Sequence, residues 1–263
     1  MSELAGVPKR LWVFDLDGPL MRTGELYEVA LVSSTDLIYE VCNGRFSKEE
    51  IRFTQNEIDK KMLREIDPRN GEPFLYRKSR FPLSLIRTYK YFCQKIGKEF
   101  KRVLARQLHK IGKKVFDERE YEKTIRPQVL PLFKFLKGEG DKVFILTKGA
   151  EEVQFGKKKA LKNLGIMEYC DGFIVVPDTK NAMIKKIRED NFALRYYCIG
   201  DTYLEDVLPG MDVGYFGIYI PYEFNWKERD RFDEIEAGRD KERSVRYLHV
   251  GQISQYFNKL KSA

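Results

Sequence analysis

The sequence is poor in the residues that build soft-metal sites and disulfide frameworks. Its 263 residues include only two histidines and four cysteines. The cysteines are far apart in the chain, with no CxxC pair and no neighbouring histidine cluster: Cys42, Cys93, Cys170 and Cys198. This scatter argues against a zinc site and against a disulfide-stabilised fold, so we expect free, buried thiols.

Long apolar runs are also missing. The hydrophobic fraction of 43% is typical of a globular protein, but no run approaches the roughly 20 apolar residues that span a bilayer. Residues 1–10 contain no apolar core of a secretory signal and lead directly into a predicted strand. We therefore expect a cytoplasmic protein without membrane contact, built as one domain with a large insertion or as two domains.

Acidic residues are scarce in one segment. Residues 21–130 hold 24 lysines and arginines against 16 acids, which accounts for the whole net charge of +8. Within residues 77–114 there are 13 basic residues and a single acid, Glu99. This segment could recognise a nucleotide or polyanion, but we favour amphipathic helices with buried aromatic side chains and solvated cations.

The first half of the chain is dominated by helical patterns. They cover residues 24–43, a stretch that begins at the N-cap Ser47, and two further stretches at residues 82–92 and 99–113. A block of about 100 residues is too long to be a simple crossover between strands. We predict that residues 21–125 form an all-helical cap domain inserted after the first strand.

The rest of the chain alternates between strand and helix. Apolar stretches with strand character cover residues 11–14, 142–146, 172–176, 196–199 and 213–220, and a last helix is expected near residues 253–260. Repeated β–α units favour a parallel sheet with helices on both faces. The predicted fold class is therefore α/β: a Rossmann-like, doubly wound parallel sheet formed by residues 1–20 and 126–263.

Polar residues stand where these strands end. They are Asp15 and Asp17 after the first, Thr147 and Lys148 after the second, Lys180 beyond the third, and Asp201 and Asp206 after the fourth. Carboxyl ends of parallel strands meet at one edge of a sheet, where α/β proteins bind ligands. Carboxylates without histidine or cysteine suit a hard cation such as Mg²⁺, which shares its coordination with substrate phosphate.

This series of motifs closely resembles that of the haloacid-dehalogenase-like superfamily. The matching residues are Asp15-Leu16-Asp17-Gly18, Thr147, Lys180 and Gly200-Asp201-Thr202-Tyr203-Leu204-Glu205-Asp206. The resemblance implies that Asp15 attacks phosphorus and that Asp17 protonates the leaving group and then activates water. It also implies that Thr147 binds a phosphoryl oxygen and that Lys180 balances charge beside Asp15.

The resemblance further implies a metal site and a reaction class. Asp15, the backbone carbonyl of Asp17, and Asp201 would bind Mg²⁺, while Asp206 would support the metal-site loop. Dehalogenases of the superfamily lack an acid two residues after the nucleophile, so Asp17 favours a phosphatase acting on a small phosphorylated substrate. The alternatives are a phosphomutase, or a non-catalytic protein that binds a polyanion or nucleic acid through the basic cap; the oligomeric state stays open.

Several assignments have competing interpretations. Thr147 alone could be a helix N-cap, and Asp206 could be an acid in the first turn of a helix. Other lysines compete with Lys180 for the charge-balancing position: Lys148, Lys157, Lys158, Lys159, Lys185 and Lys186. The chain also departs from the family pattern at Pro19, where threonine is usual, so we expect a stiffer loop there.

Overall fold

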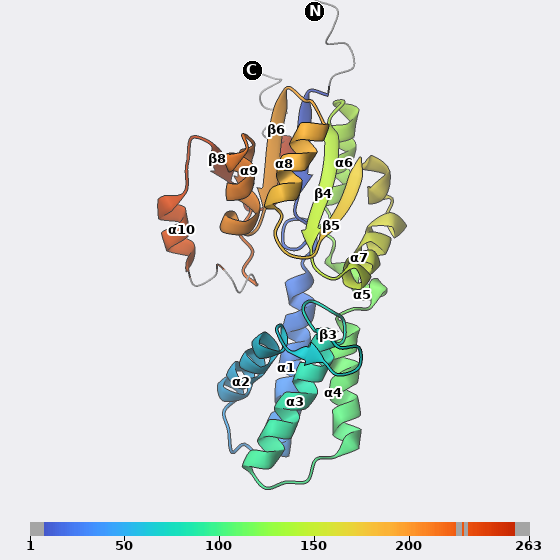
Figure 1. Cartoon of the computed structure of the whole chain (residues 1–263), viewed down its shortest axis with the longest axis vertical. Coiled ribbons are helices and arrows are strands. Elements are labelled where there is room, and N and C mark those ends of the chain that lie inside the picture. Colours follow the sequence, from blue (N-terminus) through green and yellow to red (C-terminus); the bar gives the residue numbers. More distant parts are fainter. Residues whose placement is uncertain (1–7, 225–227, 229–230, 256–263) are drawn as a thin grey trace, which may run out of the picture. The chain divides into compact units, whose positions relative to one another are not determined.

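The computed structural model describes residues 8–224, 228 and 231–255. The chain divides into two compact units (Figure 1). The first unit comprises Met1–Gly24, Glu122–Lys148 and Lys158–Ala263, and the second comprises Glu25–Tyr121 and Gly149–Lys157. The predicted domain boundaries differ from these units chiefly at residues 149–157, which the sequence pattern assigned to the core.

The first unit contains a six-stranded sheet in the order β5-β4-β1-β6-β7-β8, and every neighbouring pair is parallel. The strands are β1 (Arg10–Phe14), β4 (Lys142–Lys148), β5 (Gly172–Val176), β6 (Arg195–Gly200), β7 (Phe216–Tyr219) and β8 (Ser244–Arg246). All five residues of β1 are buried because it lies at the centre, between β4 and β6. The predicted α/β class is confirmed.

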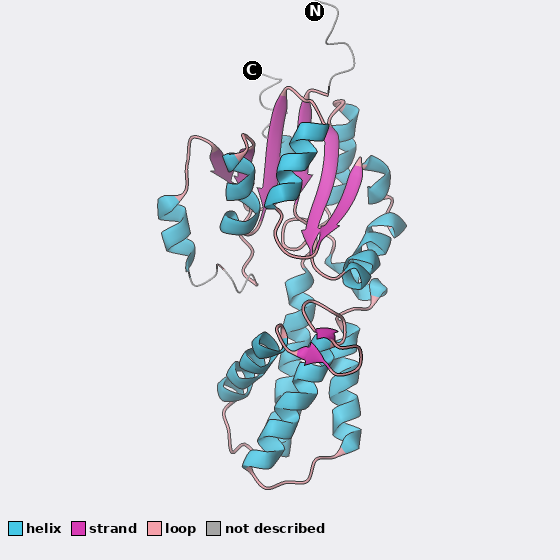
Figure 2. Cartoon of the chain, in the orientation of Figure 1, coloured by secondary structure: helices cyan, strands magenta, loops and turns pink. Residues whose placement is uncertain are grey.

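Helices pack on both faces of this sheet (Figure 2). They are α6 (Val129–Gly138), α7 (Glu151–Asn163), α8 (Asn181–Asp190), α9 (Leu208–Asp212) and α10 (Phe232–Gly238), with a 3₁₀ turn η1 (Ile166–Tyr169) and a π-helical turn η2 (Tyr203–Val207). Successive β1 side chains point to opposite faces. Val13 joins an apolar cluster with Ile184 of α8, whereas the ring of Phe14 lies 5.1 Å from that of Phe133 in α6.

The second unit is mainly helical: α1 (Thr23–Val41), α2 (Lys48–Met62), α3 (Arg80–Lys95), α4 (Arg102–Lys114) and α5 (Glu118–Thr124), the first and last of which begin or end in the other unit. Ser47 caps α2 as predicted, because its hydroxyl accepts a hydrogen bond from the Glu50 amide at 3.1 Å. The aromatic side chains of Phe81, Tyr89 and Phe92 are buried in the core of this unit, as the helical interpretation requires.

The prediction of an all-helical cap is wrong in one place. Two short antiparallel strands, β2 (Ile66–Asp67) and β3 (Glu72–Pro73), pair with each other between α2 and α3. The carboxylate of Asp67 accepts hydrogen bonds from the Arg69 backbone and side chain, which stabilises the turn that joins them. Two-residue strands contain no periodic pattern, so local sequence does not reveal them.

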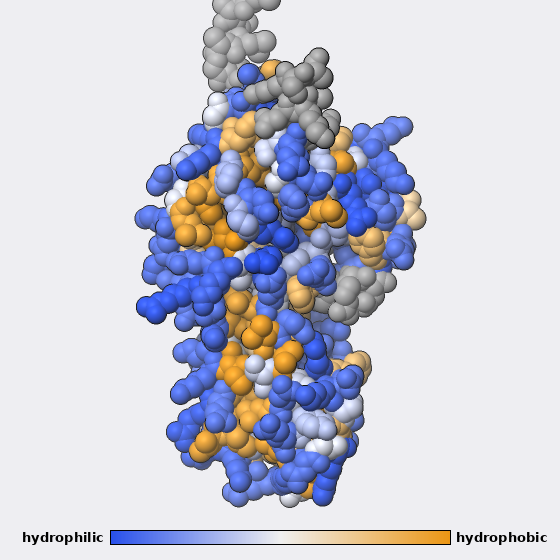
Figure 3. Space-filling view, turned by 180° about the vertical axis from the view of Figure 1, so that it is seen from behind, coloured by the Kyte–Doolittle hydropathy of each residue, from blue (hydrophilic) through white to orange (hydrophobic). Residues whose placement is uncertain are grey.

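Four other elements did not follow from sequence pattern: α5, α9, α10 and β8. The predicted closing helix at residues 253–260 lies largely outside the described residues, although residues 251–255 are helical. No described helix combines the length and the apolar character needed to cross a bilayer. Figure 3, a view from behind, shows hydrophilic side chains beside an apolar strip on the surface of the second unit.

Candidate active site

Asp15 is held at the carboxyl edge of the sheet by the central strand. Its amide donates a hydrogen bond to the Ile199 carbonyl at 2.7 Å, which extends the β1–β6 ladder by one residue. The chain then turns back, with the Met21 amide donating to the Leu16 carbonyl at 3.0 Å. Within this turn, the backbone angle φ of Gly18 is 93°, a left-handed conformation that favours glycine.

Gly18 is also required by a close approach. A Cβ atom at this position would lie 2.5 Å from Cγ of Asp201, which is too short for any real contact. Gly200 has the same function on the neighbouring strand, since a Cβ there would lie 2.1 Å from Cβ of Asp206. The two glycines therefore allow carboxylates from β1 and β6 to crowd into one place.

Lys180 connects two of these carboxylates. Its ammonium Nζ donates to Oδ1 of Asp15 at 2.5 Å and to Oδ1 of Asp206 at 2.6 Å, and all three side chains are buried. Burial alone would lower the pKa of Lys180, but the two carboxylates outweigh that effect and raise it above its ordinary value. Lys180 comes from the start of α8, 165 residues after Asp15.

The competing lysines lie elsewhere. Lys185 and Lys186 pair with acids one turn further along α8, Glu189 and Asp190. Lys148 donates to Oε2 of Glu205 at 2.8 Å. Lys180 thus occupies the charge-balancing position that the sequence motif assigned to it, while the catalytic role itself stays a prediction.

Three carboxylates form a group that fits a cation. Asp15, Asp201 and Asp206 each offer an oxygen, and these atoms lie within 4.8 Å of one another. Burial and the neighbouring acids raise the pKa of Asp15 to about 7 and raise that of Asp201 well above its ordinary value. One lysine cannot balance three buried carboxylates, so the donor set and its electrostatics suit Mg²⁺.

Both carboxylate oxygens of Asp206 accept hydrogen bonds. One of its oxygens accepts from Lys180, and the other accepts from the Thr202 amide at 3.1 Å. Its own amide donates to the Thr202 carbonyl at 2.9 Å. These contacts fit the predicted supporting role, in which Asp206 orients Lys180 and the loop after β6.

Asp17 and Thr147 lie at the same sheet edge but outside this carboxylate group. Oδ1 of Asp17 accepts a hydrogen bond from the Thr23 hydroxyl at 2.6 Å, which orients the side chain. Thr147 is buried in β4; since Phe14 pairs with Ile145, Thr147 lies two residues further along, beside the Asp15 loop. The predicted site residues thus stand at the carboxyl ends of β1, β4 and β6, and Lys180 reaches them from the start of α8.

Sequence reasoning missed Thr23, Arg126 and Glu228. Arg126 donates from Nε to the Gly18 carbonyl at 2.8 Å and so supports the turn after Asp15. The Glu228 carboxylate accepts from the amides of Tyr203 and Leu204, at 2.8 and 2.9 Å. Those amides begin η2, which contains Asp206. Position 228 lies in a charged segment without periodicity, so no local signal indicates this contact.

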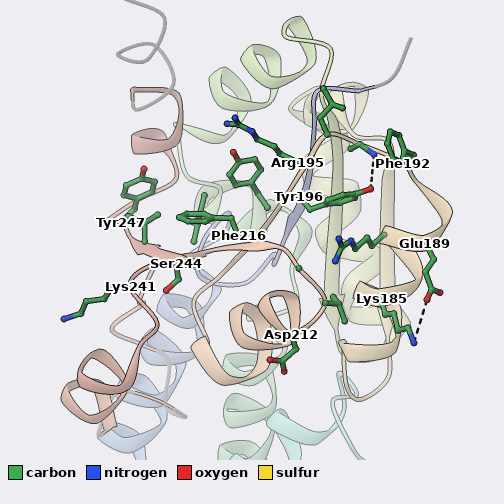
Figure 4. Close-up of a pocket in the computed structure, with 18 residues that line it drawn as sticks. Lys185, Glu189, Phe192, Arg195, Tyr196, Asp212, Phe216, Lys241, Ser244 and Tyr247 are labelled. Carbon is green, nitrogen blue, oxygen red and sulfur yellow. Dashed lines mark hydrogen bonds and ion pairs between the residues drawn. The ribbon is translucent and has the colours of Figure 1, made fainter. Parts of the chain in front are cut away.

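The large cavity in the first unit is not this site. It has a volume of about 1470 Å³ and is lined by residues at the amino ends of β6, β7 and β8, among them Arg195, Phe216 and Ser244 (Figure 4). None of the predicted site residues lines it. Ligands of α/β sheets bind at the opposite, carboxyl edge.

Known structures agree with this topology, although no family model and no curated protein matches the sequence. A haloacid dehalogenase-like family hydrolase from Xanthomonas campestris superposes with a TM-score of 0.62 at 17% identity, covering 93% of this chain and 88% of that one. The chain has the haloacid-dehalogenase-like hydrolase fold. The fold predicted from the motifs is therefore confirmed.

The fold by itself is compatible with more than one reaction. A 2-haloacid dehalogenase from Pseudomonas syringae has a TM-score of 0.54 at 18% identity, covering 96% of this chain and 99% of that one. A haloacid-dehalogenase-type phosphatase from Thermococcus onnurineus has a TM-score of 0.51 at 16% identity, with coverages of 94% and 97%. The reaction class must therefore be argued from the residues of the site.

Proposed function

We propose that this protein is a Mg²⁺-dependent phosphatase that hydrolyses a small phosphomonoester through an aspartyl-phosphate on Asp15. The main support is the pairing of the buried Asp15 carboxylate with the Lys180 ammonium at the carboxyl edge of the sheet. A second acid, Asp17, lies two residues after Asp15. The fold supports an enzyme of the haloacid-dehalogenase-like type.

The first half of the reaction uses Asp15 and Asp17. An Asp15 oxygen attacks phosphorus, the bond from phosphorus to the ester oxygen breaks, and Asp17 gives its proton to the departing alkoxide. The hydrogen bond from Thr23 orients the Asp17 carboxyl for this transfer. Lys180 keeps the attacking carboxylate in place and offsets the charge of its acidic neighbours.

In the second half, Asp17 takes a proton from water, the water oxygen attacks phosphorus, and the bond to Asp15 breaks to release phosphate. Asp15, the Asp17 carbonyl and Asp201 would hold Mg²⁺, which when bound neutralises phosphoryl oxygens and the carboxylates around them. A phosphomutase would use the same residues but pass the phosphoryl group to a second hydroxyl group instead of water.

Asp17 distinguishes this reaction from dehalogenation. An alkoxide is a poor leaving group and needs a proton, whereas a halide leaves as a stable anion without one. A second acid beside the nucleophile is therefore useful for a phosphoester and has no function in carbon–halogen cleavage. The hydrogen bond that fixes Asp17 supports the phosphatase over the dehalogenase.

A substrate panel tests the proposal. Phosphate release from aryl, sugar and nucleoside monophosphates would be measured with Mg²⁺ and with EDTA, alongside halide release from 2-chloropropionate. We expect Mg²⁺-dependent phosphate release and no halide. Asp15→Asn is expected to lower kcat at least about 10⁴-fold and Asp17→Asn about 10²- to 10⁴-fold.

Asp178→Asn is the matched control, since Asp178 is an exposed acid in the loop just before Lys180. Its kcat should match the wild type. Halide release, or phosphate release that persists in EDTA, would contradict the proposal. Transfer of label from substrate to a second sugar hydroxyl, faster than release of phosphate, would identify a mutase instead.

A further inference from the structure

Arginines on two adjacent helices of the second unit differ in whether an acid pairs with them. In α3, Arg80 donates to Oδ2 of Asp59 at 2.6 Å and Arg87 pairs with Glu65. In α4, which packs beside α3 (Figure 1), Arg102 and Arg106 are exposed, and no described carboxylate lies within ion-pair distance of either. Arg102 and Arg106 of α4 thus lack the described acidic partners that Arg80 and Arg87 of α3 have.

Three exposed cations of α4, Arg102, Arg106 and Lys113, share one face with His109. Arg102, Arg106, His109 and Lys113 follow the i, i+4, i+7, i+11 spacing that aligns side chains along one side of a helix, and we call them the α4 stripe. Successive members lie one turn apart, about 5–6 Å along the axis. Repulsion between like charges at this spacing costs stability, and the described part of the chain supplies no acid to relieve it.

A groove runs between the α4 stripe and α3. It has a volume of about 480 Å³ and is lined by Ile86 of α3 together with Arg102, Ala105, Arg106 and His109 of α4. Burial and the neighbouring Lys113 and Arg69 lower the pKa of His109, which favours the neutral form of its imidazole. The groove has a small apolar floor and a cationic wall, and among the described residues it is lined by no acid and by no Phe, Tyr or Trp.

We propose that the α4 stripe and this groove bind the sugar–phosphate backbone of a double-helical nucleic acid. Backbone phosphates recur every few ångströms along a strand, so several cations of one straight helix can contact them together. An acidic protein partner would need large apolar or aromatic anchors at the centre of its site, and the only described apolar residues that line this groove are Ile86 and Ala105. A single strand would stack successive bases on side chains such as Phe, Tyr and Trp, none of which lines the groove in the described part of the chain.

Fluorescence anisotropy with the full chain tests the proposal. The probe is a fluorescein-labelled DNA duplex of about 20 base pairs and mixed sequence, titrated without Mg²⁺ at several salt concentrations. With three exposed cations engaged, the slope of log K against log salt should be about −2.7. Arg102→Gln with Arg106→Gln should weaken binding at least about tenfold at 0.1 M salt and reduce the slope by about 1.8.

The matched control removes two other cations from the same unit. Lys48→Gln with Lys60→Gln makes the same change in net charge, but both lysines are already paired with acids. This control should keep at least half of the wild-type affinity. A second variant, Ala105→Glu, adds an acid to the groove floor and should weaken binding like the double arginine variant.

Three results would overturn the proposal. The first is equal weakening in the arginine and lysine double variants, which would indicate net charge alone. The second is displacement of the duplex by poly-glutamate at equal charge concentration, which would indicate an acidic protein partner. The third is tighter binding of the corresponding single strand than of the duplex. The assay does not involve Asp15, so it stands independently of the proposed phosphatase activity.

Discussion

Two charged regions of this molecule differ in whether their charges have partners. The charges of the first are paired within the site, whereas the arginines of the second have no described acid beside them. At the carboxyl edge of the sheet, Lys180 and the carboxylates of Asp15 and Asp206 are buried, and each finds its partner within the same site. On α4, the exposed cations Arg102 and Arg106 have no described acid beside them. Buried opposite charges indicate groups positioned for chemistry, whereas exposed charges of one sign indicate recognition of a separate molecule.

The comparison also separates stability from function. Removal of either member of a buried ion pair strongly destabilises the protein, because the remaining charge is left desolvated and unpaired. Removal of an exposed cation changes the free energy of unfolding little. Where it relieves repulsion between like charges, it even stabilises the folded state. Substitutions at the two regions should therefore change the free energy of unfolding in opposite directions.

The largest effect is expected for Lys180→Met. Removing the ammonium leaves Asp15 and Asp206 buried without their shared cation, so the free energy of unfolding should fall by about 3–5 kcal/mol in urea titrations. Lys185→Met, on the exposed side of α8, should change it by less than about 1 kcal/mol. Equal losses in both variants would show that Lys180 is not a buried charge partner.

Gly200→Ala should be next in size. The new Cβ would meet Asp206 Cβ at 2.1 Å, so β6 or the η2 turn must shift, at a cost of about 2–3 kcal/mol and with a loss of activity. Gly138→Ala is the control, because nothing lies within 4 Å of its Cβ position at the end of α6. That variant should be neutral or slightly stabilising in thermal unfolding.

The pH dependence of stability tests the raised pKa of the buried Asp15 carboxyl group. Burial and nearby acids raise its pKa to about 7 from an ordinary 3.8, so the folded protein keeps a proton that the unfolded chain has lost. Stability of the metal-free protein should therefore fall as the pH rises from about 4 to about 7.

Asp15→Asn isolates this contribution, because asparagine does not titrate. The difference in unfolding free energy between wild type and variant should change with pH over the same interval and level off above about pH 8. A difference that is constant with pH would show that Asp15 ionises normally in the folded protein.

The smallest effect is expected on α4. Arg102→Gln with Arg106→Gln should raise the free energy of unfolding by about 0.2–0.5 kcal/mol at low salt, and the gain should disappear in 1 M salt, where like charges no longer repel. In contrast, Arg87→Gln in α3 should lower stability slightly, because it removes the partner of Glu65. A loss of stability in the α4 variant would indicate a partner within the chain.

Much of the sheet and the site followed from local pattern. Short apolar runs such as Leu11–Phe14 predict buried parallel strands, and polar residues directly after them predict a site at the carboxyl edge. Asp15, Asp201, Asp206 and Lys180 meet there as expected. Local pattern did not reveal the β2–β3 pair, because two-residue strands have no periodicity, nor Glu228, whose contacts with Tyr203 and Leu204 span about 25 residues of sequence.

By itself, the sequence determined which residues stand at strand ends, where most helices form, and that the positive charge is concentrated in residues 77–114. These properties depend on neighbours within a few turns of chain. Only the tertiary structure decided that Lys180, of seven candidate lysines, reaches Asp15, and that Arg102 and Arg106 of α4 lack the described acidic partners that Arg80 and Arg87 of α3 have. Such pairings depend on distances between segments far apart in sequence, which are set by the packing of the whole fold.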